Sequence, residues 1–237
     1  MKAVLISVLL IATGCVNRRG SATPNKKIME NKLPKIGVLI FDGFLTNEVC
    51  APFDVFTKKD LVGQSLFDVY LVARSHEVVT SEEGIRVVPD YSMEDCPPLD
   101  VLIVPSSNHP DDLVSDEKMI DFIKIQNVNT QYTASHCAGA FALGASGIAD
   151  GKKLVTYFGG GEKLQREYPE ILVQNDSLHA VVRDGKFFSS NGNLVSYLAS
   201  LELLEQMSGA DQRRRVENEL LIHKLCNDEY SGFHHEK

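Results

Sequence analysis

The chain has 237 residues, 43% of them hydrophobic, which is enough to bury one sizeable core but not two large ones. Charged residues make up 24% and the formal net charge is −8, so the basic stripe typical of nucleic-acid binding is not expected. The short basic run Arg213–Arg215 has acidic residues nearby and is interpreted as solvated surface.

The N-terminal residues resemble an export signal. Lys2 is followed by an apolar run from Ala3 to Ala12, and small residues precede Cys15. This pattern is typical of a secretory signal peptide, and the run is too short to span a bilayer as a helix. Small residues before a cysteine are similar to the bacterial lipoprotein signal, which predicts cleavage and lipidation at Cys15. The alternatives are an ordinary signal peptide that is cleaved nearby, an uncleaved anchor, and a cytosolic protein whose N-terminus happens to be apolar.

These patterns divide the chain into four parts. Residues 1–15 are the expected signal peptide, and the polar segment 16–34 is expected to be a flexible tether. Residues 35–209 are the expected domain, followed by a charged C-terminal extension at 210–237. We therefore expect a protein of the bacterial cell envelope, either periplasmic or held to the membrane by a lipid, with the cytoplasm as the alternative.

The first half of the domain alternates between strands and helices. Residues 35–41 form a continuous apolar, β-branched run, which predicts a strand buried on both faces. After a turn at Asp42–Gly43, apolar residues at helical spacing predict a helix through residue 56. Further strands are predicted at 67–73, 100–104 and 132–135, a small hairpin at 78–88, and helices at 114–125 and 138–148.

The second half continues this alternation. A helix is predicted at 162–168, short strands at 171–173, 179–183 and 186–189, and a long helix at 194–207 that ends at Gly209. Asp184–Gly185 predicts a tight turn between two of these strands. Strands that alternate with helices predict an α/β sandwich with a mostly parallel sheet.

Residues 133–140 carry the strongest chemical signal. A short strand enters a helix through Cys137, and the residues that follow it are alanine and glycine. This is the layout of a nucleophile elbow, whose sharp turn needs small neighbours. An elbow places the thiol at a helix N-terminus, which is expected to lower its pKa. The alternative is that Cys137 is a small buried hydrophobic residue.

Three segments resemble the ThiJ/PfpI family of the class I glutamine amidotransferase-like superfamily. They are Phe-Asp-Gly-Phe at 41–44 with the helix after it, Ser-His-Cys-Ala-Gly-Ala at 135–140, and Asp-Gly-Lys-Phe-Phe-Ser-Ser-Asn-Gly at 184–192. The resemblance spans 35–209 and is nearest to isonitrile hydratase and the amidotransferase-like domains of AraC-type regulators. It implies a flavodoxin-like three-layer sandwich and leaves the substrate open, because one such fold hosts enzymes, chaperones and sensors.

The resemblance also implies site residues. Glu48 matches the family acid that hydrogen-bonds the cysteine sulfur, and backbone N–H groups at Ala138 and near Ser107 would form an oxyanion hole. The chain departs from the family where Ser106 and Ser107 replace two glycines. It departs again at Ala138, where isonitrile hydratase has threonine, which counts against isonitrile hydration itself.

Four residues are accessory candidates at the site. Tyr157 stands where the family often has a histidine. His136 precedes the cysteine, whereas protease-like members have a histidine after it, and His109 lies in the loop after the third strand. Cys50 is interpreted either as a resolving thiol near Cys137 or, more simply, as a small buried side chain.

The expected function is that of a cysteine-dependent hydrolase, hydratase or lyase acting on a small carbonyl, amide or nitrile-like compound. The alternative is a non-catalytic ligand-binding or redox-sensing envelope domain. No metal or organic cofactor is expected, and the resemblance implies a homodimer. The irregular cysteine spacing predicts no disulfide framework, which leaves open the state of Cys50, Cys96 and Cys226.

Overall fold

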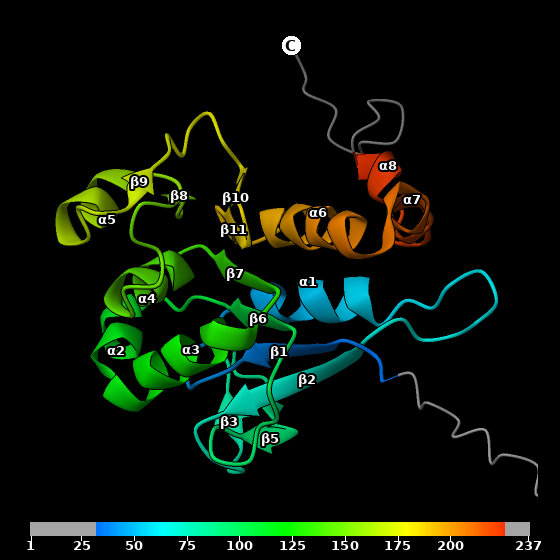
Figure 1. Ribbon diagram of the computed structural model, residues 1–237, viewed down its shortest axis with the longest axis horizontal. Coiled ribbons are helices and arrows are strands. Elements are labelled where there is room, and N and C mark those ends of the chain that lie inside the picture. The colour runs from blue at the N-terminus through cyan, green and yellow to red at the C-terminus, as the bar shows by residue number, and fades with distance from the viewer. Residues whose placement is uncertain (1–31, 226–237) are drawn as a thin grey trace, which may run out of the picture. The chain divides into compact units, whose positions relative to one another are not determined.

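A seven-stranded sheet organises the computed structural model, which describes residues 32–225 (Figure 1). Its strand order is β10-β11-β7-β6-β1-β2-β5. The expectations for Cys15, Cys226 and segments 1–31 and 226–237 lie outside the described residues. The sheet strands are β1 (Lys35–Leu39), β2 (Asp68–Ala73), β5 (Tyr91–Ser92), β6 (Val101–Val104), β7 (Tyr132–His136), β10 (Val181–Asp184) and β11 (Phe187–Ser190).

All neighbouring strands of this sheet run parallel except β10 and β11, which form an antiparallel hairpin at one edge. The hairpin turns at Gly185, whose φ of +60° is in the region that glycine enters without steric cost. Two smaller sheets stand apart. One is the antiparallel pair β3 (Val79–Thr80) and β4 (Arg86–Val87), and the other is the parallel pair β8 (Lys153–Leu154) and β9 (Leu172–Val173).

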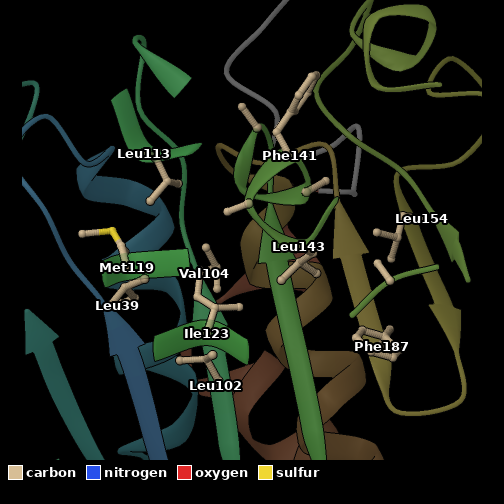
Figure 2. Close-up of a cluster of buried hydrophobic side chains, with 14 of the residues drawn as sticks. Leu39, Leu102, Val104, Leu113, Met119, Ile123, Phe141, Leu143, Leu154 and Phe187 are labelled. Carbon is tan, nitrogen blue, oxygen red and sulfur yellow. The ribbon is translucent and has the colours of Figure 1, made fainter. Parts of the chain in front are cut away.

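Helices cover both faces of the sheet, so the predicted three-layer α/β sandwich is confirmed (Figure 1). One face carries α1 (Thr46–Phe56) and α6 (Val195–Ser208), which bury apolar side chains against Val38, Ile103 and Phe188. The other face carries α2 (Pro110–Ser115), α3 (Glu117–Asn129) and α4 (Gly139–Ala145). Figure 2 shows this second core, with Leu113, Met119, Ile123, Phe141 and Leu143 around Leu39, Leu102 and Val104.

The structure divides the helix predicted at 114–125 into α2 and α3. Asp116 lies between them in an extended conformation, and its side chain accepts the Met119 N–H at 3.2 Å as the cap of α3. Aspartate competes with helical hydrogen bonding in this way, which apolar spacing alone does not reveal. The helix predicted at 138–148 is also shorter than expected, because Gly147 follows α4 with a φ of +70°.

Two more helices follow α6. They are α7 (Ala210–Glu219) and α8 (Ile222–Leu225), and the remaining helix, α5 (Gly161–Glu167), lies beside β8 and β9 (Figure 1). Val216 is fully buried against the core of the α6 face, so part of the charged extension packs on the domain. Arg213 forms ion pairs with Glu205 and Glu217 at 2.7 and 2.8 Å. The other two arginines of the basic run 213–215 also form ion pairs with acidic side chains.

Candidate active site

Cys137 occupies a sharp turn between β7 and α4. Its φ is +52°, a conformation that costs a non-glycine residue of order 1–3 kcal/mol. Two hydrogen bonds hold the turn: the Cys137 N–H donates to the Ser190 carbonyl and the Thr156 hydroxyl donates to the Cys137 carbonyl, both at 2.9 Å. The strand-turn-helix geometry predicted from residues 133–140 is therefore present.

Gly139 lets the first turn of α4 approach the end of β6. A Cβ atom there would lie well inside van der Waals contact of the Val104 carbonyl oxygen, which is backbone and has little freedom to move. Glycine at this position brings the strand end at Val104 and the elbow at Cys137 together. This close approach is the physical reason for the small residue after the nucleophile elbow.

Glu48 reaches this turn from the α1 side of the sheet. Its side chain is fully buried, and the Ser106 N–H donates to Oε2 at 2.7 Å while the Asn193 N–H donates to Oε1 at 3.0 Å. The carboxyl group also lies beside the Cys137 thiol, close enough for each group to shift the pKa of the other. Segments separated by up to 145 residues in the sequence therefore meet at one carboxylate.

Gly192 closes the site. Its φ is +83°, and a Cβ atom would overlap both Glu48 Oε1 and the Cys137 side chain. Asn193 follows with a φ of +51°, which turns its N–H toward Glu48. Sequence reasoning missed Gly192, Asn193, Thr156 and Ser190 as site residues. The Asn-Gly-Asn sequence at 191–193 is a turn signal that could have pointed to the first two.

Burial raises both pKa values of the central pair. Desolvation raises the pKa of Glu48 to about 7, although hydrogen bonds from Asn193 and Ser106 lower it. Desolvation, followed by the charge of Glu48, raises the pKa of the Cys137 thiol to about 11. The two groups share one site and titrate as a coupled pair.

The prediction that the elbow lowers the pKa of the Cys137 thiol is therefore wrong. The side chain of Ser106 and the N–H of Ala138 do face the sulfur and lower the thiol pKa, as expected at an elbow. Their effect is smaller than the combined cost of desolvation and of a buried carboxylate next to a thiolate. At neutral pH the thiol is accordingly protonated, and Glu48 is the group of the pair that titrates.

The two serines that replace glycines do not strain the backbone. Ser106 and Ser107 are both buried, and neither has a positive φ. Ser106 is the one that meets the pair, because its N–H binds Glu48 and its side chain contacts the sulfur. The Ser107 hydroxyl instead accepts the His109 N–H at 3.1 Å.

The accessory candidates lie around the site rather than in it. His136 is buried, its Nδ1 is 2.9 Å from the Ser190 hydroxyl, and burial lowers its pKa to about 3. His109 is exposed at the start of α2. Tyr157 is half-buried and its ring stacks on Phe141 at 6.1 Å.

Cys50 does not approach Cys137. It is exposed to solvent, two residues beyond the buried Glu48 on α1, and such residues lie on nearly opposite sides of a helix. The interpretation of Cys50 as a small buried side chain is therefore wrong, and its place on α1 gives no support to a role as a resolving thiol. Within residues 32–225, Cys50, Cys96 and Cys137 are free thiols.

Two features are absent from the described part of the chain. Residues 32–225 contain no group of three or more His, Cys, Asp or Glu side chains placed to hold a metal ion. No helix in the same range is both long enough and apolar enough to cross a membrane.

Comparison with known proteins agrees with this geometry. Residues 34–206 match the model of the DJ-1/PfpI family. The chain is 31% identical over 189 residues to isonitrile hydratase from Pseudomonas putida, an alignment that covers 78% of this chain and 77% of that protein.

Solved structures show the same fold. A ThiJ/PfpI family protein from Pseudomonas syringae superimposes with a TM-score of 0.72 at 22% identity, over 92% of this chain and 87% of that one. An AraC family transcriptional regulator from Pseudomonas putida superimposes with a TM-score of 0.65 at 16% identity, over 79% of this chain and 99% of that one. The family match over most of the domain is decisive: the chain belongs to the DJ-1/PfpI family.

Proposed function

We propose that the protein is a cysteine-dependent enzyme that acts on a small carbonyl, amide or nitrile-like compound. The observation that carries this proposal is the buried Glu48 carboxyl group against the sulfur of Cys137, at a strained turn between β7 and α4. A buried acid beside a thiol in an elbow is an arrangement suited to nucleophilic catalysis. The similarity to isonitrile hydratase supports a small substrate of this class.

Glu48 acts as the general base in this proposal. Its pKa of about 7 lies near neutral pH, where a base is most effective, and the thiol has a pKa of about 11. The carboxylate therefore accepts the thiol proton as the sulfur attacks the electrophilic carbon. A carbon–sulfur bond forms, and the π-electron pair moves to the substrate oxygen or nitrogen, which then takes the proton from Glu48.

The developing negative charge needs donors beside the sulfur. The Ala138 N–H lies beside the sulfur and provides the first such donor, whereas the Ser106 hydroxyl donates to the Ser107 carbonyl at 3.1 Å. Ser107 is buried in the same loop and stays a candidate for the substrate-facing side. A nitrile-like substrate thereby becomes a thioimidate, whereas an amide adduct also expels its amine, which takes the hydroxyl proton as it leaves, to give a thioester. Glu48 then removes a proton from water as the water adds to that carbon, and the Cys137 sulfur leaves and takes this proton back.

Alkylation of Cys137 by iodoacetamide tests the pair without a known substrate. The test uses a background in which Cys50, Cys96 and Cys226 are serine, with Cys137→Ser as the blank and peptide mapping as the readout. We expect the labelling rate to rise through an inflection near pH 7 and Glu48→Gln to abolish that inflection. A single rise near the ordinary thiol pKa of about 8.5, with no effect of Glu48→Gln, would contradict the proposal.

A ligand-binding domain is the second candidate. It is favoured by the enclosure of the nucleophile, since only 9% of Cys137 is exposed. It predicts that small carbonyl compounds raise the melting temperature without turnover, and that Cys137 is alkylated slowly at every pH. Turnover that depends on Cys137 would exclude it.

We further propose that residues 1–15 direct the protein to the bacterial cell envelope, with Cys15 as the lipidated residue. Expressed from its own N-terminus in bacteria, the protein should partition with membranes. Cys15→Ser should move it to the aqueous fraction, and Cys226→Ser should not. Equal partitioning of Cys15→Ser and the unchanged protein would contradict a lipid anchor.

We also propose a homodimer, which analytical ultracentrifugation of the domain would test.

A further inference from the structure

Ser190 connects two parts of the site. Its carbonyl accepts the Cys137 N–H at 2.9 Å, and its hydroxyl accepts the Gly192 N–H at 3.2 Å. Ser190, at the end of β11, therefore holds the backbone of Cys137 through its carbonyl. Its hydroxyl holds the backbone of the 191–193 loop, which closes the site. Asn193, the next residue of that loop, donates its N–H to Glu48.

His136 fixes the hydroxyl of Ser190. The two residues are paired across β7 and β11, and Nδ1 of His136 lies 2.9 Å from Ser190 Oγ. His136 is fully buried, and within the described residues Nε2 has no hydrogen-bond partner. The imidazole ring is therefore oriented through Nδ1, and its contact with Ser190 determines how the hydroxyl can be oriented.

A continuous set of contacts leads from His136 to the reactive pair. It passes through the Ser190 hydroxyl and the Gly192 N–H to the Asn193 N–H and Glu48. Gly192 itself lies in direct contact with Glu48 and Cys137, so a small displacement of the loop changes the environment of both groups. No bond in this set joins His136 to the sulfur.

We propose that His136 is a positioning residue which, through the Ser190 hydroxyl, holds the Gly192–Asn193 loop so that its N–H group binds Glu48. His136 works as a neutral ring in this role. Its burial, which lowers its pKa to about 3, keeps it uncharged throughout the range in which Glu48 titrates. It is therefore not a base for the thiol, although it is adjacent to Cys137 in the sequence.

Four variants test this link. Ser190→Ala and His136→Leu remove it from either end, and His136→Asn retains a polar group near the position of Nδ1. Ser200→Ala is the matched control, because Ser200 is equally buried on α6 but its hydroxyl has no hydrogen-bond partner among the described residues. Far-ultraviolet circular dichroism and the melting temperature identify variants that fail to fold.

The first readout is hydrogen exchange of the Gly192 and Asn193 amides, which does not depend on any enzymatic activity. We expect exchange at least about 10-fold faster in Ser190→Ala and His136→Leu, and unchanged in Ser200→Ala and His136→Asn. The double variant His136→Leu/Ser190→Ala should match the single ones, because both remove the same link. Unchanged amide exchange in the single variants, or additive effects in the double variant, would overturn the inference.

The second readout is the pH profile of Cys137 alkylation. Burial raises the pKa of Glu48, the N–H groups of Asn193 and Ser106 lower it, and Glu83 raises it slightly. Cys137 is the titratable group beside it. Loosening the Asn193 bond should therefore move the Glu48 inflection upward by on the order of one pH unit. A lower melting temperature with an unmoved inflection would show that His136 is only structural.

This inference rests on the proposed Cys137–Glu48 pair, and different results would contradict the pair and the positioning role of His136. Absence of an inflection near pH 7 in the unchanged protein contradicts the role of Glu48 as a base. Unaltered Gly192 and Asn193 exchange in Ser190→Ala contradicts the positioning role, whatever the pH profile shows.

Discussion

Gly192 shows how tightly single residues determine this site. It is in the left-handed region and directly against Glu48 and Cys137, so the backbone and the packing both require glycine. Cys137 and Asn193, the two residues beside it in space and in sequence, adopt positive φ values although they are not glycine. Such conformations gathered in one place are typical of functional sites, where the surrounding structure holds the strain.

Replacing Gly192 with alanine separates strain from clash. Gly185 provides the control, because its φ is also positive but nothing lies within 4 Å of a Cβ there. Gly185→Ala should cost roughly 1 kcal/mol in the free energy of unfolding, from the left-handed backbone alone. Gly192→Ala should cost roughly 1–3 kcal/mol more and alter Cys137 alkylation. Equal urea midpoints for the two variants would contradict the close contact at Gly192.

At the scale of elements, the site depends on how α1 packs against α6. Helix α1 carries Glu48, and α6 begins directly after the loop that binds it. The Tyr197 hydroxyl donates to Asp54 at 2.7 Å and joins these helices away from the sulfur. Because burial raises the pKa of Tyr197 and Asp54 raises it further, the phenol stays protonated and can donate throughout the ordinary pH range.

Tyr197→Phe should therefore lower stability without changing the chemistry. Loss of one hydrogen bond to a carboxylate at a partly exposed position should cost about 1 kcal/mol. The urea midpoint should fall while the pH inflection of Cys137 alkylation stays in place. An inflection that moved with Tyr197→Phe would mean that the α1–α6 contact, rather than the 191–193 loop, sets the pKa of Glu48.

The sequence predicted most elements because their apolar periodicity is strong. Residues 35–41 and 100–104 could be recognised as buried strands, and 194–207 as a helix ended by Gly209, which has a φ of +85°. The division at Asp116 and the length of α4 depend on local hydrogen bonds and glycine conformations that periodicity does not encode.

The site was predictable where a local motif carries it. The elbow at Cys137 has a sequence signature of its own, and the position of Glu48 came from family resemblance. The turn signal at 191–193 marks Gly192 and Asn193 as a turn, but their contact with Glu48 joins residues far apart in the sequence, and no local pattern reports that contact. The direction of the thiol pKa was missed for the same reason, since burial is a property of the whole fold.

For the whole molecule, two buried groups affect stability in opposite directions as the pH changes. Glu48 has a raised pKa, so the folded state binds more protons than the unfolded state. The contribution of Glu48 to stability therefore falls as the pH rises from about 4.5 to 7. His136 has a lowered pKa, so the unfolded state binds more protons and stability rises between about pH 3 and 6.5. The two effects offset each other where the ranges overlap.

Glu48→Gln should reveal this balance. In the unchanged protein, Glu48 should lower the free energy of unfolding by about 3 kcal/mol as the pH rises from 4.5 to 7. The variant should not show this decrease, so its stability should rise relative to the unchanged protein over that range. Urea unfolding at unit steps from pH 4 to pH 8 measures the difference. Parallel stability curves for the two proteins would show that Glu48 has an ordinary pKa.

The span between Glu48 and Asn193 also has a consequence for folding during synthesis. When the ribosome has released β1 through α4, both Glu48 and Cys137 have emerged, but the 191–193 loop and α6 have not. The last strand pair and α6 must dock before the carboxylate receives its second N–H and the sulfur becomes enclosed. Protection of Cys137 from a fast thiol reagent would therefore report the final step of folding in a nascent chain.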